Sequence, residues 1–323
     1  MAKRGTKAKS SKAVSARAGS ALKQGRRPGK GSGGGVAVLG PNSYGKSRVR
    51  MMKVIRDNKT QRHDVHELTV DVALEGDFEA VHTRGDNSKC LPTDTMKNTV
   101  YALGLEHPLD SIESFALHLA NYFVENHGQV SAARVRIAET PWSRMTVRGR
   151  AHQHSFVHGG AERSTCEVIA TREYEGVLSG IKGLVILKST NSAFSGYPKD
   201  RYTSLQETRE RIFCTSVTAT WNYPRMAAGA VFGRFNAIRE KVRRALLDTF
   251  ADHKSESVQQ TLFAMGEAAL KACREIDQIR LSLPNKHYLL VNLSQFGPKN
   301  ENEIFTPTDE PHGLIEATVE RRR

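Results

Sequence analysis

Hydrophobic and polar residues alternate along the segment HELTVDVALE, which starts at His66. Its hydrophobic positions recur at every second residue, namely Leu68, Val70, Val72 and Leu74. A period of two indicates a strand with one buried face, because successive side chains point to opposite faces of a sheet. A second β-rich run covers residues 49–56, and the polar residues 57–59 separate the two runs. We therefore expect a pair of strands here.

A helical period replaces this alternation in the next part of the chain. Residues 94–105 and 110–126 predict helices, and the second has one hydrophobic face made of Ile112, Phe115, Ala116, Leu119 and Phe123. Asp110 and Glu113 have the spacing of a capping box, and Gly128 is placed to close the helix. Residues 133–140 and 152–158 predict two further strands. The first half therefore has the order strand, strand, helix, helix, strand, strand.

The second half repeats this order with different residues. A hairpin is predicted at residues 167–175 and 178–188. Three helical segments are predicted at residues 208–212, at residues 232–250 and from Ser257 onward. Three strands are predicted at residues 279–283, 286–293 and 314–319. We infer an α+β fold of two tandem antiparallel domains, residues 36–160 and 161–320, with helices packed on one face of each sheet. Neither sheet closes on itself, so we expect exposed edges and oligomerisation.

The formal net charge of +14 is concentrated at the two ends of the chain. Residues 1–35 hold ten Lys or Arg and no acidic residue, and the chain ends in Arg321, Arg322 and Arg323, so the remainder is nearly neutral. The first 35 residues have few large apolar side chains, and we expect a disordered basic tail. A tail of this kind binds RNA or acidic surfaces weakly and without specificity. Nucleic-acid binding driven by this tail stays an alternative, but we expect no specific nucleic-acid partner.

Cysteine usage and hydropathy point to the cytoplasm. The four cysteines are far apart and form no short-range framework, which is typical of free thiols in a reducing compartment. No run of about 18 apolar residues is present to span a membrane. The basic N-terminus lacks the apolar segment of a secretory signal. We expect a cytoplasmic protein with no membrane association.

One stretch of the second half combines a strand with a candidate binding loop. The apolar run from Leu184 to Leu187 predicts a buried strand that ends in the polar cluster KSTNS. Phe194 follows in a loop of small and turn-forming residues, where a ring can be presented to a ligand. Arg211 comes next, on the helical segment predicted there.

Several polar residues could bind a planar anionic ligand, and each has an ordinary alternative. The Arg211 guanidinium offers a planar fork of donors, although most surface arginines are solvated or ion-paired. Gln259 lies in the first turn of a helix with Ser257 as its expected N-cap, and its amide could donate and accept, as could any surface Gln. Phe194 could equally be a core aromatic. Asn285 and His287 share a strand face, which also fits a turn followed by a buried histidine.

Six segments, in this order along residues 40–320, resemble the urate oxidase family: YGKSRVRMMKV from Tyr44, TDTMKNTVY from Thr93, HQHSF from His152, LKSTNSAF from Leu187, SVQQTL from Ser257 and LPNKHY from Leu283. The resemblance implies tandem tunnelling-fold (T-fold) domains in a homotetrameric barrel, with active sites between subunits. It also implies purine catabolism: urate, O2 and water give 5-hydroxyisourate and hydrogen peroxide. Neither a metal nor an organic cofactor is implied.

The same resemblance implies a role for each site residue. Arg211 and Gln259 would hold the purine edge from both sides, with a hydrogen bond from the Val258 backbone, and urate would stack on Phe194. Asn285 would hold O2 and later the attacking water. His287 would belong to a proton relay with Lys46 and Thr93 of the neighbouring subunit. The backbone of Asp94 would contact the substrate, while its side chain could also cap the following helix.

Metal binding is the main alternative. His152 and His154 lie on one face of a predicted strand with His158 close by, as in some zinc or copper sites. T-fold relatives that act on pterins use zinc, so a zinc-dependent enzyme acting on a pterin or purine-like substrate is a second hypothesis. In urate oxidases the matching histidines bind no metal, and we expect no metal site.

Three features depart from the family pattern. Ser195 follows Phe194 where some members have a large aromatic residue. Residues 221–228, which we expect to form a loop, do not align residue by residue. The chain ends in three arginines instead of the Ser-Lys-Leu peroxisomal signal that eukaryotic members often carry. These departures bear more on affinity than on the type of reaction.

Overall fold

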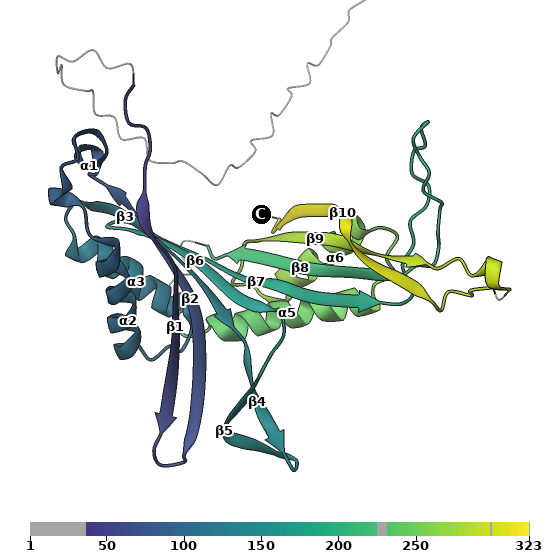
Figure 1. Cartoon of the computed structure of the whole chain (residues 1–323), viewed down its shortest axis with the longest axis horizontal. Coiled ribbons are helices and arrows are strands. Elements are labelled where there is room, and N and C mark those ends of the chain that lie inside the picture. The colour runs from purple at the N-terminus through teal and green to yellow at the C-terminus, as the bar shows by residue number, and fades with distance from the viewer. Residues whose placement is uncertain (1–36, 225–230, 298, 323) are drawn as a thin grey trace, which may run out of the picture. The chain divides into compact units, whose positions relative to one another are not determined.

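Eight strands form one antiparallel sheet in the order β1-β2-β3-β6-β7-β8-β9-β10 (Figure 1). The computed structural model describes residues 37–224, 231–297 and 299–322. The predicted basic tail, residues 1–35, lies outside the described residues. The strands are β1 (Tyr44–Asp57), β2 (Arg62–Gly76), β3 (Val130–Thr140), β6 (Arg163–Thr171), β7 (Glu175–Lys188), β8 (Phe213–Asn222), β9 (Gln278–Leu290) and β10 (Phe305–Glu320). Each strand pairs antiparallel with its neighbour.

The main helices cover one face of this sheet (Figure 1). They are α2 (Thr93–Glu106), α3 (Ile112–Asn126), α5 (Phe235–Asp252) and α6 (Val258–Ala272), with a short α1 (Glu79–Arg84) ahead of them. Single-turn 3-10 helices span Asn87–Lys89 and Ser294–Phe296. The alternating residues Leu68, Val70, Val72 and Leu74 are all buried under the helices, as their period predicted. The predicted α+β class, with helices on one face of antiparallel strands, is confirmed.

The order strand, strand, helix, helix, strand, strand occurs twice along the chain. The first repeat is β1, β2, α2, α3, β3 and β6, and the second is β7, β8, α5, α6, β9 and β10. The repeats join where β6 pairs with β7, so one sheet runs through both, and the chain from Leu39 onward forms one compact unit. The domain division after residue 160 stays a prediction, and the element order favours a boundary between β6 and β7.

The predicted strand at residues 152–158 exists, but it does not join the main sheet. It is β5 (Arg150–His158), which pairs only with β4 (Trp142–Val147) in a hairpin that projects from the sheet (Figure 1). Pro141 separates this hairpin from β3, and its carbonyl accepts a hydrogen bond from the Gly159 amide at 2.9 Å. A proline cannot donate to a strand ladder, so the chain leaves the sheet here.

Three predictions for the second half were wrong. Residues 208–212 are not helical, and they lead into β8, a strand that the prediction missed. Residues 221–222 also belong to β8 and not to a loop. Val217, Ala219 and Trp221 alternate as buried residues of β8, but its many threonines conceal the period. The two strands predicted at residues 279–293 are one strand, β9, which runs through Pro284.

Details of the elements also differ from the prediction. The N-cap of α3 is Ser111, whose Oγ accepts from the Ser114 amide at 3.1 Å, so the capping box of Asp110 and Glu113 was wrong. The helix ends at His127 in extended conformation and not at a left-handed Gly128.

The run Leu184 to Leu187 lies in β7, but only Leu184 and Ile186 are buried, while Val185 and Leu187 are about half exposed. The prediction of a fully buried strand was therefore wrong: one side of β7 faces away from the helices.

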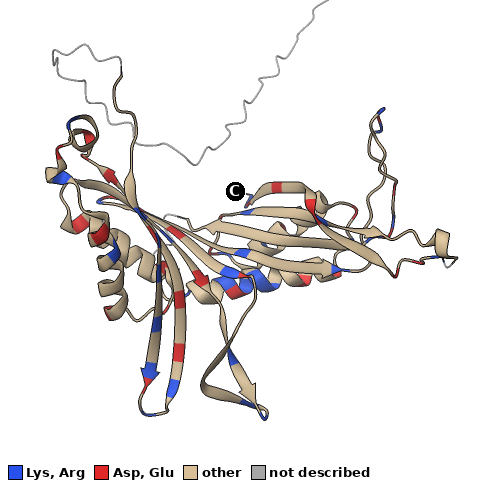
Figure 2. Ribbon diagram, viewed as in Figure 1, with Lys and Arg blue, Asp and Glu red and all other residues tan. Residues whose placement is uncertain are grey.

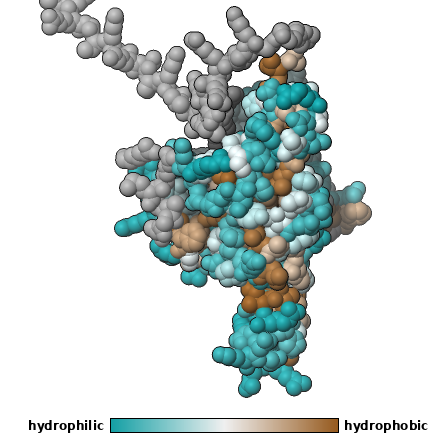
Figure 3. All heavy atoms as spheres, turned by 90° about the vertical axis from the view of Figure 1, so that its left-hand side faces the viewer, coloured by the Kyte–Doolittle hydropathy of each residue, from teal (hydrophilic) through white to brown (hydrophobic). Residues whose placement is uncertain are grey.

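Charges of both signs mix on the folded part of the chain. Figure 2 shows Lys and Arg interspersed with Asp and Glu along β1 and β2. Exposed hydrophobic residues also occur, and Figure 3 shows hydrophobic patches on the side that carries α2 and β1, where Met52, Tyr101 and Leu105 are exposed. Among the described residues, no helix combines the length and the apolar character needed to cross a bilayer.

A buried ion pair links the helices of the two repeats. Arg239 of α5 donates to Glu113 of α3, and the side chains are 9% and 0% exposed, respectively. Ser179 of β7 also donates to Glu113, and it accepts from the Tyr223 hydroxyl at 2.8 Å. Burial raises the pKa of Tyr223 to about 12, so the hydroxyl keeps its proton. This network fixes the helices of one repeat to the strands and helix of the other.

Replacing Glu113 by Gln should lower the free energy of unfolding by about 3–5 kcal/mol, because Arg239 would be left buried without a counter-charge. Chemical denaturation followed by circular dichroism measures the change. The matched control is Glu267→Gln, which removes an exposed pair with Lys271 and should cost less than about 1 kcal/mol. Equal losses in the two variants would show that the buried pair has no special role.

Candidate functional site

Ser192 brings Phe194 and Arg211 together after the end of β7. It forms a single bridge to Ser255, where the Ala193 amide donates to the Ser255 carbonyl at 2.7 Å. The Arg211 amide donates to the Ser192 carbonyl at 2.9 Å, and Arg211 Nε donates to Ser192 Oγ at 3.3 Å. Phe194 exchanges backbone hydrogen bonds of 2.8 and 3.0 Å with Thr208. The loop is therefore held at both ends, and Arg211 lies in an extended segment ahead of β8, not on the helix that the sequence predicted.

The Phe194 ring is supported on one side and lies close to the guanidinium. Tyr197 stacks on it with the centroids 4.8 Å apart and the planes at 14°. The Arg211 Cζ lies 5.5 Å from the Phe194 centroid. Burial lowers the pKa of Arg211, and within the described part of the chain no carboxylate lies within ion-pair distance of it. A half-buried cation without a counter-charge, next to an aromatic ring, suits a planar anion.

The N-terminus of α6 lies next to this loop. Ser257 caps the helix through its Oγ, which accepts from the Gln260 amide at 3.1 Å, so the predicted N-cap is confirmed. Ser255, fully buried, donates to the Ser257 carbonyl at 3.1 Å and accepts from Thr261 at 2.8 Å. The amides of Val258 and Gln259 begin the helix, where N–H groups have no partner inside the helix and favour negative charge.

Asn285 and His287 lie on β9 with their side chains on the helix-covered face. They share the parity of Leu281 and Leu283, which are fully buried under α6. Arg321 donates to the carbonyls of Leu270 and Cys273 at the other end of α6. Because Glu320 pairs with Gln278, the C-terminus of α6 lies near the start of β9, and its N-terminus lies toward the other end of this strand.

Six predicted residues therefore lie toward one end of the second repeat, and we call them the C-terminal half-site: Phe194, Arg211, Val258, Gln259, Asn285 and His287. Among the described residues, the side chains of Gln259, Asn285 and His287 make no hydrogen bond. Polar groups gathered without partners are what a ligand site offers before a ligand binds.

The other three predicted residues, Lys46, Thr93 and Asp94, form an N-terminal half-site. Lys46 lies on β1, and Thr93 is the first residue of α2. Tyr44 joins the two elements, because its hydroxyl donates to the Leu91 carbonyl at 3.2 Å. Burial raises the pKa of Tyr44 to about 12.

The side chain of Asp94 does not cap α2. It pairs with Lys97 and accepts from Asn98 at 3.1 Å, while Pro92 is the N-cap of α2 and makes no side-chain bond. The suggested capping by Asp94 was therefore wrong. The hydrogen bond from Lys97 holds the pKa of Asp94 below its usual range, and the charge of Lys46 lowers it further, so Lys46 lies near Asp94.

The two half-sites do not meet within one chain. β1 and β9 are separated by six inter-strand spacings in the sheet, which corresponds to about 29 Å at ~4.8 Å per spacing. A single small ligand cannot bridge this distance. If the nine residues form one site, a second copy of the chain must supply one of the halves.

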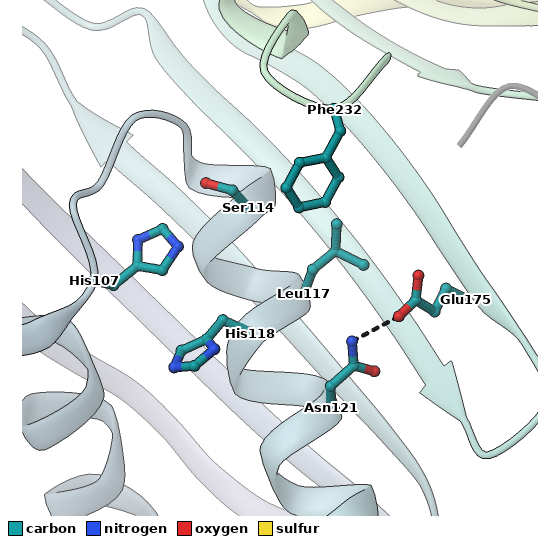
Figure 4. A pocket seen from close by; sticks show the side chains of 7 residues that line it. All are labelled: His107, Ser114, Leu117, His118, Asn121, Glu175 and Phe232. Carbon is teal, nitrogen blue, oxygen red and sulfur yellow. Dashed lines mark hydrogen bonds between the residues drawn. The ribbon is translucent and has the colours of Figure 1, made fainter. Parts of the chain in front are cut away.

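One cavity of the described chain is lined by none of these nine residues. It has a volume of about 240 Å³ and is lined by His107, Ser114, Leu117, His118, Asn121, Glu175 and Phe232 (Figure 4). In it the rings of His107 and His118 lie 5.5 Å apart, and Asn121 donates to Glu175 at 2.6 Å. Burial lowers the pKa of His107. Sequence reasoning did not predict this cavity, because its residues come from segments that no motif connects.

The histidines of the β4–β5 hairpin bond to the backbone. His152 and His154 lie with their rings 4.7 Å apart and perpendicular, and His158 packs edge-on against Trp142. The Nδ1 atoms of His152 and His158 accept from backbone amides at 3.3 and 3.2 Å. In the part of the chain that the structure describes, no three His, Cys, Asp or Glu residues are grouped to hold a metal ion.

Known proteins resemble this chain over most of its length. The model of the uricase family matches residues 42–169 and 177–316. The uricase of Arthrobacter globiformis is 43% identical over 290 residues, covering 90% of this chain and 92% of that protein. The uricase of Aspergillus flavus is 38% identical over 288 residues, covering 86% and 95%.

Solved structures agree with these sequence matches. The crystal structure of the Arthrobacter globiformis uricase has a TM-score of 0.82 to this chain at 42% identity, covering 88% and 95% of the two chains. The urate oxidase of Bacillus sp. TB-90 has a TM-score of 0.77 at 21% identity, covering 87% of this chain and all of that one. At this lower identity the likeness concerns the fold alone.

Removing the buried hydroxyl of Ser255 should loosen the loop that carries Phe194. Ser255→Ala loses the bonds to Ser257 and Thr261, and we expect the amides of Ala193 and Arg211 to exchange with deuterium about tenfold faster, since the two lost bonds at about 0.7 kcal/mol each give about 1.4 kcal/mol. Hydrogen exchange measured by mass spectrometry tests this. The control is Ser204→Ala, an exposed position of the same loop. Unchanged exchange at residues 193 and 211 would contradict the role of Ser255 as the loop anchor.

Proposed function

The chain belongs to the uricase family, and we propose that it oxidises urate with O2 and water to 5-hydroxyisourate and hydrogen peroxide at a site shared by two copies of the chain. The observation that carries this proposal is the match of the family model to nearly all of the chain from residue 42 to residue 316. As a urate oxidase the protein acts in purine catabolism.

The C-terminal half-site binds the purine. The planar fork of Arg211 donates to adjacent acceptors on one edge of the urate anion, and Gln259 donates and accepts on the other. The Val258 amide donates from the start of α6, where the helix dipole favours negative charge. Urate stacks on the Phe194 ring, which Tyr197 supports from behind. The low pKa of Arg211 reflects burial that the bound anion would compensate.

Oxygen and proton transfer use residues of both half-sites. Asn285 holds O2, and later the attacking water, above the stacked ring. His287 forms a proton relay with Lys46 and Thr93 from the neighbouring subunit. The backbone of Asp94 contacts the substrate, since its side chain is already bound to Lys97 and Asn98.

The reaction requires no metal or organic cofactor because urate is its own reductant. O2 is a triplet that accepts single electrons, and an electron-rich urate dianion can donate them. The protein then has to deprotonate urate, orient it and hold O2. This is an exception to the general rule that cofactors perform oxidative chemistry.

The assembly that completes the site is a homotetrameric barrel. Three observations support it: the separation of the half-sites by six strand spacings, unpaired outer edges on β1 and β10, and half-exposed Val185 and Leu187 on the open face of β7. Sheet edges and large apolar side chains of this kind are commonly covered by another subunit. The cysteines, all free thiols in the structure, favour the cytoplasm as the compartment.

Metal-stripped protein in excess chelator should consume urate. We expect loss of the urate ultraviolet band with one O2 taken up and one peroxide released per urate. Lys46→Met should then slow oxidation by about a hundredfold or more, the range that general-base catalysis contributes, with urate binding largely intact. An inactive stripped protein that zinc or copper reactivates would instead favour a metal enzyme, such as one acting on a pterin.

A shared site predicts that two inactive variants complement each other. Lys46→Met damages the N-terminal half-site and Arg211→Gln the C-terminal half-site, so each variant alone should be nearly inactive. In randomly mixed oligomers, one site in four receives an intact N-terminal half-site and an intact C-terminal half-site. The mixture should therefore recover about a quarter of the wild-type activity. Activity after co-refolding and mass-spectrometric detection of mixed oligomers measure this.

The control for this experiment mixes two variants of the same half, Lys46→Met and Thr93→Val, which should recover nothing. No recovery from the first mixture, despite demonstrated mixed oligomers, would place both half-sites of each active site in one chain.

A further inference from the structure

Thr215 carries a buried hydroxyl that has no partner in the described chain. The residue lies on β8 and is 0% exposed. Its Oγ1 makes no hydrogen bond, although a threonine hydroxyl can donate one and accept two. A buried polar atom without a partner destabilises a fold, so in a folded protein it calls for an explanation such as a water or a ligand-linked contact.

The neighbours of Thr215 in the sheet show where its hydroxyl is useful. On one side it pairs with Ile186 of β7, which offers no polar atom. On the other side it pairs directly with Asn285 of β9. Directly opposed residues of an antiparallel pair point to the same face, with Cβ atoms about 5 Å apart. The Thr215 hydroxyl and the Asn285 carboxamide therefore lie side by side on the helix-covered face.

Asn285 has no comparable neighbour on its other side. There it pairs with Gly313 of β10, which has no side chain. A Cβ at Gly313 would meet nothing nearer than Ile315 at 3.8 Å, so this side of Asn285 is open. Of the two residues that flank Asn285 in the sheet, Thr215 alone can orient its amide.

We propose that Thr215 is a positioning residue for Asn285, whose carboxamide oxygen accepts a hydrogen bond from the Thr215 hydroxyl when the site is occupied. This inference rests on the proposed role of Asn285 in holding O2. An asparagine amide can turn over, and its two orientations present opposite polarity to a ligand. With the oxygen bound to Thr215, the NH2 group points at O2 and stabilises the negative charge that develops there as urate gives up electrons.

Stability and catalysis favour different residues at position 215. A valine has the shape of threonine without the hydroxyl, so an orphan hydroxyl alone would favour valine. The Thr215 hydroxyl instead forms its hydrogen bond when the site is occupied, a state that the unliganded chain does not show. Polar groups that weaken a fold yet support chemistry are typical of active sites.

The test compares Thr215→Val with wild type in steady-state kinetics at varied O2 and urate. We expect kcat/KM for O2 to fall about tenfold, the effect of one lost hydrogen bond, with the Kd for urate unchanged and the thermal midpoint equal or higher. Thr215→Ser keeps the hydroxyl and should restore most of the rate. Thr218→Val is the matched control, since it makes the same change on the same strand but on the opposite face, opposite Ser282.

The double variant with Asn285→Ala separates a positioning role from a general one. If Thr215 acts through Asn285, Thr215→Val has no further effect once the amide is gone. Wild-type kinetics in Thr215→Val, or an equal loss in the Asn285→Ala background, would overturn the inference while the urate oxidase activity stands. A wild-type protein that does not oxidise urate would overturn the proposed function first and this inference with it.

Discussion

Among the described residues, helices cover only one face of the sheet, and the packing of the core and the exposure of the other face both follow from this asymmetry. An open sheet of eight strands presents two edges and one uncovered face to its surroundings, and large apolar residues such as Val185 and Leu187 are about half exposed there. Burying such surface against another copy is favourable. The proposed assembly of subunits would bury this surface, and it would place the proposed active sites between subunits.

The face of the sheet that the helices cover is buried. There the helices of both repeats bury a continuous core, and the Glu113–Arg239 pair joins α3 to α5 across the middle. Such a pair adds little net stability compared with apolar packing, but it is strongly unfavourable when either partner is missing. It therefore acts chiefly to fix how the two repeats dock, and so it keeps the second repeat in register with the first. The placement of β9 and its site residues relative to β1 depends on this docking.

The candidate site lies where neither kind of packing satisfies its polar groups. The side chains of Ser192, Ser255 and Thr261 are buried and hydrogen-bonded, and they hold the loop and the start of α6 in place. Gln259, Asn285 and His287 stand at the end of this rigid frame without hydrogen bonds in the described chain. A frame whose own polar atoms are hydrogen-bonded, and which carries polar side chains free to bind a ligand, is what preorganised binding requires, because little has to move when the ligand arrives.

Sequence periodicity was enough to identify most of the elements other than β8, and hence the α+β class, the repeated element order and the face that Leu68 to Leu74 bury. The sequence also determined the chemical groups of the site, because a motif such as LKSTNSAF or LPNKHY carries its residue types wherever the chain goes. The missed strand β8 and the misplaced Arg211 have one cause. Their conformation depends on partners far along the chain, β7 and Ser192, and local propensity does not encode such pairings.

Which side chains become neighbours depends on the tertiary fold. The bridge from Ser192 to Ser255 brings the Phe194 loop to α6, the register of β8 with β9 sets Thr215 beside Asn285, and the strand order separates Lys46 from both. Register and strand order are set by packing of the whole sheet against its helices, where a shift of one residue would turn every side chain to the wrong face. That information is spread over the core as a whole, so no single stretch of sequence could reveal it.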